Sequence, residues 1–149
     1  HESLIDGDRQ KLSRVFLNII SNAFQAVEDE SRLWFTTKEN ITDGVIEFCI
    51  GNSGSYIDEK SLPHLFDEFF SSKKPGGTGL GLAISRKLIV DHGGRIWCES
   101  SKAKRRVEFY FTIPVALGHK TCFSGKLPEV SLDLLKPGDQ SFALAENDD

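Results

Sequence analysis

The chain has 149 residues, and its 18 Lys and Arg against 22 Asp and Glu give a formal net charge of −4. This acidic balance argues against nucleic acid as a partner, because proteins that bind a phosphate backbone carry a basic excess. The apolar fraction of 39% indicates a globular domain. The sequence contains no apolar run of the roughly 20 residues that a membrane helix needs, so we expect no membrane contact by this domain.

The first predicted element is an amphipathic helix that begins after Asp8, a residue suited to cap a helix. Two strands are then predicted over residues 31–37 and 45–50, and residues 51–56 indicate a turn. In the helix, apolar residues recur every three or four positions, as expected of one buried face, at Leu12, Val15, Phe16, Ile19, Ala23, Ala26 and Val27.

Residues 59–70 predict a short helix followed by an aromatic loop, and residues 71–79 are polar and rich in glycine. A second helix is predicted over residues 80–91, ended by Gly93 and Gly94.

Residues 95–99 and 106–113 predict a hairpin, and the alternation of its last strand indicates one buried face. Helices and strands over residues 1–115 therefore predict one α/β domain. We expect a two-layer α/β sandwich, in which helices cover one face of a mixed, mostly antiparallel sheet. Residues 116–149 contain more acidic than basic residues and several Pro and Gly, and we interpret them as an acidic linker or tail, with partial order left open.

The three cysteines form no CxxC pair, which favours neither a zinc site nor a disulfide framework. Cys49 and Cys98 fall in strand-like runs, and we interpret them as small buried apolar residues rather than reactive thiols. This cysteine usage favours a reduced, cytoplasmic setting.

Three carboxamides lie in the second half of the first predicted helix, at Asn18, Asn22 and Gln25. Asn18 and Asn22 are about 40° apart around the helix and share a face beside the apolar stripe. Amide oxygens suit Mg²⁺ or the polar surroundings of a phosphate. The alternative is that both asparagines are only capped or solvated.

Glycines gather at residues 76–81, where the second predicted helix begins. Such a loop lets backbone N–H groups approach a phosphate, and the helix dipole favours an anion there. It is neither a Walker P-loop nor a dinucleotide fingerprint, because the required Lys-Ser/Thr and third glycine are missing. The alternative is a flexible loop with close helix packing.

A third polar group, Asn52 to Ile57, follows a predicted strand. Asn52 at a strand end could contact an exocyclic amine, and Gly54 would let a flat ring approach the backbone. Phe66, Phe69 and Phe70 come shortly after, with a plain core role as the alternative.

In this order and spacing, the three groups resemble the ATP-binding catalytic domain of sensor histidine kinases, in the superfamily with gyrase, Hsp90 and MutL (the Bergerat fold). The asparagine motif resembles residues 17–23, the two glycine motifs resemble residues 52–57 and 77–84, and the F box resembles residues 65–70. The resemblance covers about residues 5–114, with the family's first strand absent or only begun at residues 1–5.

The resemblance implies ATP and Mg²⁺ as cofactors, with Asn18 and Asn22 as catalytic residues and Asn22 as the Mg²⁺ ligand. Asn52 would face the adenine amine. The nucleotide-binding residues that it implies are Gln25, Ala26, Asn52, Gly54, Ile57, Phe66, Phe70, Lys73, Lys74, Gly77, Thr78, Gly79, Leu80, Gly81 and Leu82.

The ATP-hydrolysing relatives carry a water-activating Glu where this chain has Asn18, whose amide cannot take a proton. This difference favours a kinase that passes the ATP γ-phosphoryl group to a histidine on an upstream dimerisation domain, for signalling to a response regulator receiver domain. None of the four histidines, His1, His64, His92 and His119, resembles that acceptor, so we expect phosphotransfer to depend on the upstream domain. Because dimerisation in the family comes from the helices of that domain, we expect the isolated domain to be monomeric.

Two residues depart from the family pattern. Asn52 stands in place of an Asp, and loss of the charged hydrogen bond predicts about tenfold weaker nucleotide binding. Tyr56 stands in place of a Gly and either narrows the pocket entrance or turns outward. These departures keep two alternatives open: a degenerate interaction module of the same fold, and a serine kinase of the anti-sigma-factor type.

Overall fold

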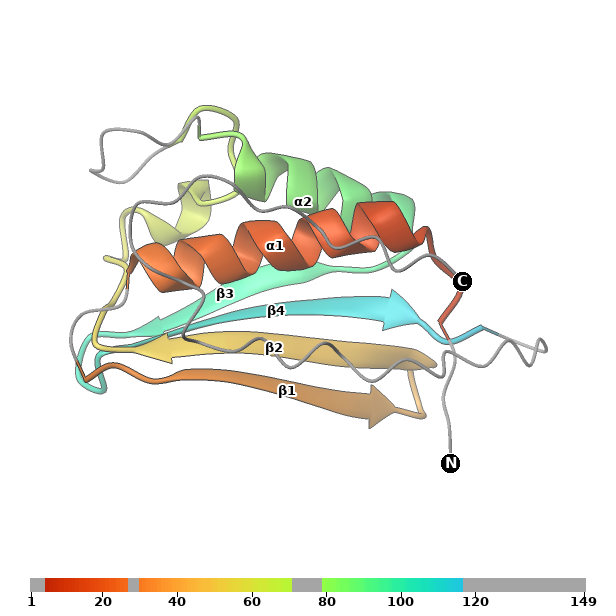
Figure 1. The fold of residues 1–149 in the computed structure, drawn as a ribbon, viewed down its shortest axis with the longest axis horizontal. Coiled ribbons are helices and arrows are strands. Elements are labelled where there is room, and N and C mark those ends of the chain that lie inside the picture. Colours follow the sequence, from red (N-terminus) through yellow and green to blue (C-terminus); the bar gives the residue numbers. More distant parts are fainter. Residues whose placement is uncertain (1–4, 27–29, 71–78, 117–149) are drawn as a thin grey trace, which may run out of the picture.

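The computed structural model describes residues 5–26, 30–70 and 79–116. Its strands form one sheet in the order β1-β2-β4-β3, with every pairing in the described residues antiparallel. Both α-helices lie on one face of this sheet (Figure 1), which confirms the predicted two-layer α/β sandwich. In chain order the elements are α1 (Arg9–Gln25), β1 (Leu33–Asn40), β2 (Val45–Ser53), the 3-10 helix η1 (Leu62–His64), α2 (Gly81–Asp91), β3 (Ile96–Ser101) and β4 (Arg106–Pro114).

Helix α1 begins where the sequence predicts. Asp8 caps it, because a carboxylate oxygen accepts a hydrogen bond from the Lys11 N–H at 3.1 Å. The apolar stripe faces the sheet and is buried at Leu12, Val15, Ile19 and Ala23. Burial of this stripe fixes the rotation of α1 about its axis, and therefore the direction of its polar side chains.

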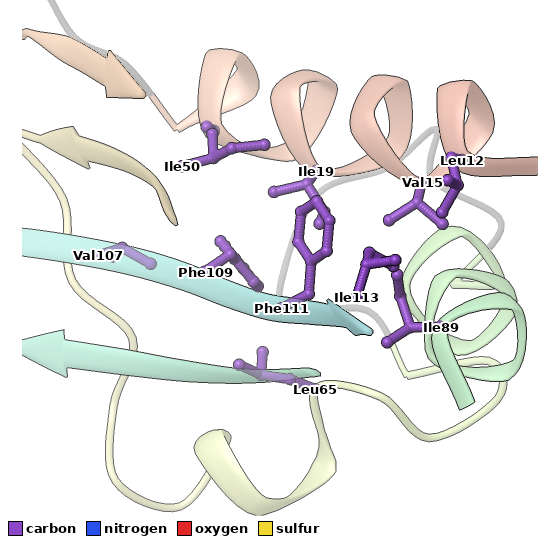
Figure 2. Packing of buried hydrophobic residues seen from close by; sticks show 11 residues of the cluster. Leu12, Val15, Ile19, Ile50, Leu65, Ile89, Val107, Phe109, Phe111 and Ile113 are labelled. Carbon is purple, nitrogen blue, oxygen red and sulfur yellow. The ribbon is translucent and has the colours of Figure 1, made fainter. Parts of the chain in front are cut away.

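The core lies between the helices and the two central strands. Figure 2 shows Phe109, Phe111 and Ile113 of β4 near Ile19 of α1 and Ile89 of α2. The Phe111 ring stacks on Phe48 at 4.9 Å and meets Phe16 edge-on at 5.1 Å, both between ring centroids. These favourable aromatic geometries join α1 to the sheet.

The opposite face of the sheet carries aromatic and charged side chains. Trp97 stacks on Tyr110 with 5.2 Å between ring centroids, and the Arg95 guanidinium lies 5.5 Å from the Trp97 ring. The Trp34 indole N–H donates to Glu108, which also pairs with Arg106 at 3.1 Å. Successive strand residues face opposite sides, so these groups point away from the helices.

The end of α2 coincides with the predicted glycine pair. The Gly94 N–H donates to the Ile89 carbonyl at 2.9 Å, and the chain then turns into β3. Two hydrogen bonds fasten this turn to β4: Arg95 N–H to Thr112 Oγ1 at 3.0 Å, and Thr112 N–H to the Arg95 carbonyl at 2.8 Å.

Several predicted strand boundaries were wrong. The first strand spans Leu33–Asn40 rather than residues 31–37, because it pairs along its whole length with β2. The second strand continues through Ser53, where a turn was predicted, because Gly51 and Asn52 stay paired with β1 and β4. Strand β3 extends to Ser101 rather than ending at residue 99, because Ser100 and Ser101 stay paired with β4.

The short helix predicted within residues 59–70 is the single 3-10 turn η1. The aromatic loop predicted after it contains Phe69, which has a positive φ of 62°.

Candidate nucleotide-binding site

The predicted motifs gather at one end of the sandwich. Figure 1 shows that α1 ends, β2 ends and α2 begins on this same side. The end of α1 carries Asn22 and Gln25, the end of β2 carries Asn52, and the start of α2 carries Gly81 and Leu82. Residues distant in sequence are thus brought to one region, as a shared site requires.

Asn18 connects α1 directly to the start of α2. Its Nδ2 donates to the Gly81 carbonyl at 3.0 Å and to Ser85 Oγ at 3.2 Å. The Ser85 hydroxyl in turn donates to the Gly81 carbonyl at 2.9 Å. The asparagine motif and the second glycine motif are therefore in contact, with the Asn18 amide as the link.

Asn22 differs from Asn18 in having no hydrogen-bond partner among the residues that the structure describes. Its side chain is half-buried, one turn beyond Asn18, and makes no hydrogen bond to any described residue. Gln25 is exposed, and its Nε2 lies 3.5 Å from Ser21 Oγ. Ala26 is the C-cap residue of α1. Within the described part of the chain, the Asn22 amide oxygen therefore remains available as a hydrogen-bond acceptor or ligand.

Asn52 is 1% exposed and lies at the end of β2. Its Nδ2 donates to the Ser53 carbonyl at 3.1 Å and to Ser55 Oγ at 2.7 Å. Both hydrogens of the amide are used, so the side-chain oxygen is the acceptor that remains. An amine donor on a flat ring would match this acceptor.

The loop after Asn52 is held on both sides. The Gly54 N–H donates to the Arg105 carbonyl at 2.9 Å, and the Arg105 guanidinium donates to the Gly54 carbonyl at 2.6 Å. Gly54 has a φ of +87°, and a Cβ there would collide with Ser31 Oγ, so only glycine fits. The Ile57 N–H donates to Ser100 Oγ at 2.8 Å, and the Ser100 hydroxyl donates to the Ile57 carbonyl at 3.1 Å.

Tyr56 takes the outward of the two arrangements considered from the sequence. Its side chain is 44% exposed, and the Lys102 ammonium lies 5.6 Å from the ring centroid. This contact places the ring against the turn between β3 and β4.

The F box packs beside the second glycine motif. The Phe69 N–H donates to the Gly79 carbonyl at 2.9 Å, which joins the two segments. Phe66 packs on the core edge-on to Phe109, with 6.5 Å between ring centroids, and Phe70 lies near His64. Phe69 is 74% exposed.

Helix α2 begins without a side-chain cap. Leu80 is its N-cap residue and has no side-chain hydrogen-bond acceptor. The first N–H groups of a helix have no partner within the helix, and the helix dipole makes this end attractive to anions. Four predicted site residues lie outside the described part of the chain: Lys73, Lys74, Gly77 and Thr78.

Titratable groups with shifted pKa values lie outside this site. Burial raises the pKa of the Cys98 thiol to about 12 and raises that of Cys49 as well. Cys49 is buried, as predicted, whereas Cys98 is only partly buried. The described residues contain no cluster of three or more His, Cys, Asp or Glu able to hold a metal ion.

Residues 7–117 match the family described as histidine kinase-, DNA gyrase B-, and HSP90-like ATPase. The chain belongs to this family. The resemblance inferred from the four motifs, and the fold that it implied, are both confirmed.

This histidine kinase-like ATPase domain is 37% identical over 114 residues to the sensor protein FixL of Bradyrhizobium diazoefficiens, covering 76% of this chain and 22% of FixL. The chain therefore spans less than a quarter of that relative's length. The catalytic domain of histidine kinase ThkA has a similar structure, with a TM-score of 0.65 and 32% identity over 74% of this chain and 70% of that chain. A crystal structure of ThkA with the response regulator TrrA matches with a TM-score of 0.62 and 31% identity, over 75% of this chain and 30% of that chain. The domain is of the ATP-binding catalytic type found in sensor histidine kinases.

Several residues that support the site were missed from the sequence. Each of them forms a hydrogen bond with a predicted site residue: Ser85 with Asn18, Ser100 with Ile57, and Arg105 with Gly54. Ser85 had a detectable signal, because it is a polar residue on the apolar side of a helix, four positions from Gly81 and Ile89. Nothing in the sequence distinguishes Ser100 or Arg105 from other polar residues of a hairpin.

Proposed function

We propose that this domain binds ATP with Mg²⁺ and supplies the γ-phosphoryl group to a histidine on another domain of a longer sensor kinase. The observation that carries the proposal is Asn22, a half-buried carboxamide that makes no hydrogen bond to a described residue and lies one turn beyond Asn18 on α1. In-line phosphoryl transfer requires positioning and charge neutralisation more than a reactive side chain.

The donor chemistry of the site fits Mg²⁺. The Asn22 amide oxygen is a hard ligand of the type that this ion accepts together with water and phosphate oxygens. When bound, Mg²⁺ neutralises the developing charge on the transferred phosphoryl group. The amide at Asn18 cannot act as a general base, so the domain itself lacks a group at this position to activate water. This lack favours transfer to a histidine over hydrolysis.

The remaining residues divide between the two ends of the nucleotide. Asn52 would accept a hydrogen bond from the adenine amine, while Gly54, Ile57, Phe66 and Leu82 would line the base and ribose. The phosphates would meet the backbone of Gly79, Leu80 and Gly81 and the free N–H groups of α2. The proposed set of nucleotide-binding residues also includes Gln25, Ala26, Phe70, Lys73, Lys74, Gly77 and Thr78.

The proposed partners are an upstream dimerisation domain with the acceptor histidine and the receiver domain of a response regulator. The similarity to ThkA, whose complex with a response regulator is known, supports the second partner. No helix in the described residues is both long and apolar enough to span a membrane. A cytoplasmic location and a monomeric isolated domain are part of the proposal.

Calorimetric titration with a non-hydrolysable ATP analogue tests the proposal. We expect micromolar binding that weakens at least tenfold without Mg²⁺. Asn22→Ala should abolish this Mg²⁺ dependence, with nearly unchanged melting temperature, because the side chain makes no hydrogen bond to a described residue. Gln10→Ala, an exposed amide at the other end of α1, is the matched control.

Two results would contradict the proposal. A folded domain that binds no nucleotide at millimolar concentration would support the interaction-module alternative, which no present observation favours. An Asn22→Ala variant with undiminished Mg²⁺ dependence would remove Asn22 as the metal ligand. Phosphotransfer is tested separately, by adding a fragment with the acceptor histidine and measuring transfer of labelled phosphate.

A further inference from the structure

Ser85 is a polar side chain in a fully buried position. Its exposure is 0%, and with Ile89 it forms the buried face of α2. Serine is a poorer helix former than alanine, and a buried hydroxyl is costly unless it is hydrogen-bonded. The packing of α2 alone would be served by alanine, so the hydroxyl calls for another explanation.

The hydroxyl belongs to a closed set of three hydrogen bonds. Ser85 donates its one hydrogen to the Gly81 carbonyl, and Asn18 Nδ2 donates to both the Gly81 carbonyl and Ser85 Oγ. A carbonyl only accepts, and the Ser85 hydrogen is already committed. Toward Asn18 both groups can therefore only accept, which directs Nδ2 rather than Oδ1 of its carboxamide to α2.

This orientation limits what Asn18 can do. Both Nδ2 hydrogens are directed to α2, so the amide has no donor left for a phosphate oxygen. Only Oδ1 remains, and it can accept a hydrogen bond from water or coordinate a cation. A Cβ on Gly81 would lie 3.8 Å from this Oδ1, so the atom lies beside the first residue of α2.

A carboxylate is disfavoured in this place. The oxygen that would replace Nδ2 would face the Gly81 carbonyl, and the Ser85 hydroxyl could donate to that oxygen only by giving up its bond to the carbonyl. The contact between α1 and α2 therefore selects an amide at position 18, in agreement with the residue present.

We propose that Ser85 is a positioning residue, which holds Asn18 so that only its Oδ1 is presented to the metal ion and the water molecules of a bound Mg²⁺–nucleotide. The inference rests on the proposed function. It gives the two asparagines different roles. Asn22 would coordinate the ion without a hydrogen bond from a described residue, whereas Asn18 depends on Ser85 for the orientation of its amide.

The test compares ADP binding with and without Mg²⁺, by calorimetry, in the parent domain, Ser85→Ala, Asn18→Ala and the double variant. We expect Ser85→Ala to weaken binding in Mg²⁺ about three- to tenfold and to change metal-free binding less than about twofold. In the Asn18→Ala background, Ser85→Ala should add less than about twofold, since its effect passes through Asn18. Ser13→Ala, which removes an exposed hydroxyl of α1 outside the asparagine motif, is the control and should bind as the parent does.

Three outcomes would overturn the inference while leaving the proposed function intact. They are parent-like binding by Ser85→Ala, equal weakening with and without Mg²⁺, and independent effects in the double variant. Ser85→Cys, close in size and weaker in hydrogen bonding, provides the same comparison if Ser85→Ala does not fold. A parent domain that binds no Mg²⁺–nucleotide would overturn both the proposed function and this inference.

Discussion

Gly93 and Gly94, which end α2, are required for different reasons, and replacing each by alanine should distinguish the two reasons. Gly93 has a φ of +78°, and a Cβ there would meet only the Pro114 ring, at an ordinary 3.4 Å. A non-glycine residue in this left-handed region costs about 1–2 kcal/mol. Gly93→Ala should therefore destabilise the domain by about that amount.

Gly94→Ala should be much more destabilising. A Cβ at Gly94 would collide with the Thr112 carbonyl oxygen and lie 3.0 Å from its carbon, and backbone atoms cannot rotate away. If the backbone at Gly94 moved away from Thr112 to make room, the two hydrogen bonds between Arg95 and Thr112 would break, and each is worth about 0.5–1.5 kcal/mol. Thr112 is 3% exposed, so its unpaired groups would add about 1–3 kcal/mol. We expect a total of about 3–5 kcal/mol.

Urea denaturation followed by far-UV circular dichroism measures both free energies of unfolding. The two variants add the same methyl group at adjacent positions, so each is a control for the other. If Gly94→Ala cost within about 0.5 kcal/mol of Gly93→Ala, the close approach to Thr112 would not be the reason for the second glycine.

Three further predictions concern other parts of the domain. Asp8→Ala should lower the urea midpoint of unfolding at pH 7, because the N-cap of α1 is lost. The hydrogen bond from the Lys11 N–H lowers the pKa of the Asp8 carboxyl, so the difference in midpoint between parent and variant should shrink as the pH falls from about 4 to 2. A difference that stays the same over this pH range would contradict the capping role of Asp8. Burial raises the pKa of the Cys98 thiol to about 12 and also raises the pKa of the Cys49 thiol. In the folded domain at pH 8, both thiols should therefore be alkylated at least about tenfold more slowly than in the urea-unfolded chain, as measured by peptide mapping. Tyr56→Gly should change ADP affinity by less than about threefold, because the ring lies against Lys102; a larger gain in calorimetry would mean that Tyr56 obstructs the site.

The fold could be predicted where apolar residues keep a regular period. The stripe of α1 and the alternation of β4 indicated both their elements and their buried faces. Boundaries failed where tertiary contacts decide them. Gly51 suggested a turn, but it is a strand residue paired with Trp34, whose indole occupies the space of a Cβ. Strand β3 runs to Ser101, beyond its predicted end, because pairing with β4 continues there.

The site was predictable as a set of motifs but not as a network. Asn18, Asn22, Asn52 and the glycines stand in a recognisable order along the chain. The partner of Asn18, however, lies 67 positions away at Ser85, and Gly54 is held by Arg105 at a separation of 51 positions. Only the packing of α1 on α2, and of the β3–β4 turn on the loop after β2, creates these pairs.

The aromatic face of the sheet has a spectroscopic consequence. Both tryptophans of the chain, Trp34 and Trp97, lie on the side of the sheet away from α1 and α2. Their intrinsic fluorescence should therefore follow unfolding of the sheet but respond little to nucleotide on the helical side. In a titration, a steady tryptophan signal would report an intact sheet, and a fluorescent nucleotide would report occupancy independently in the same sample.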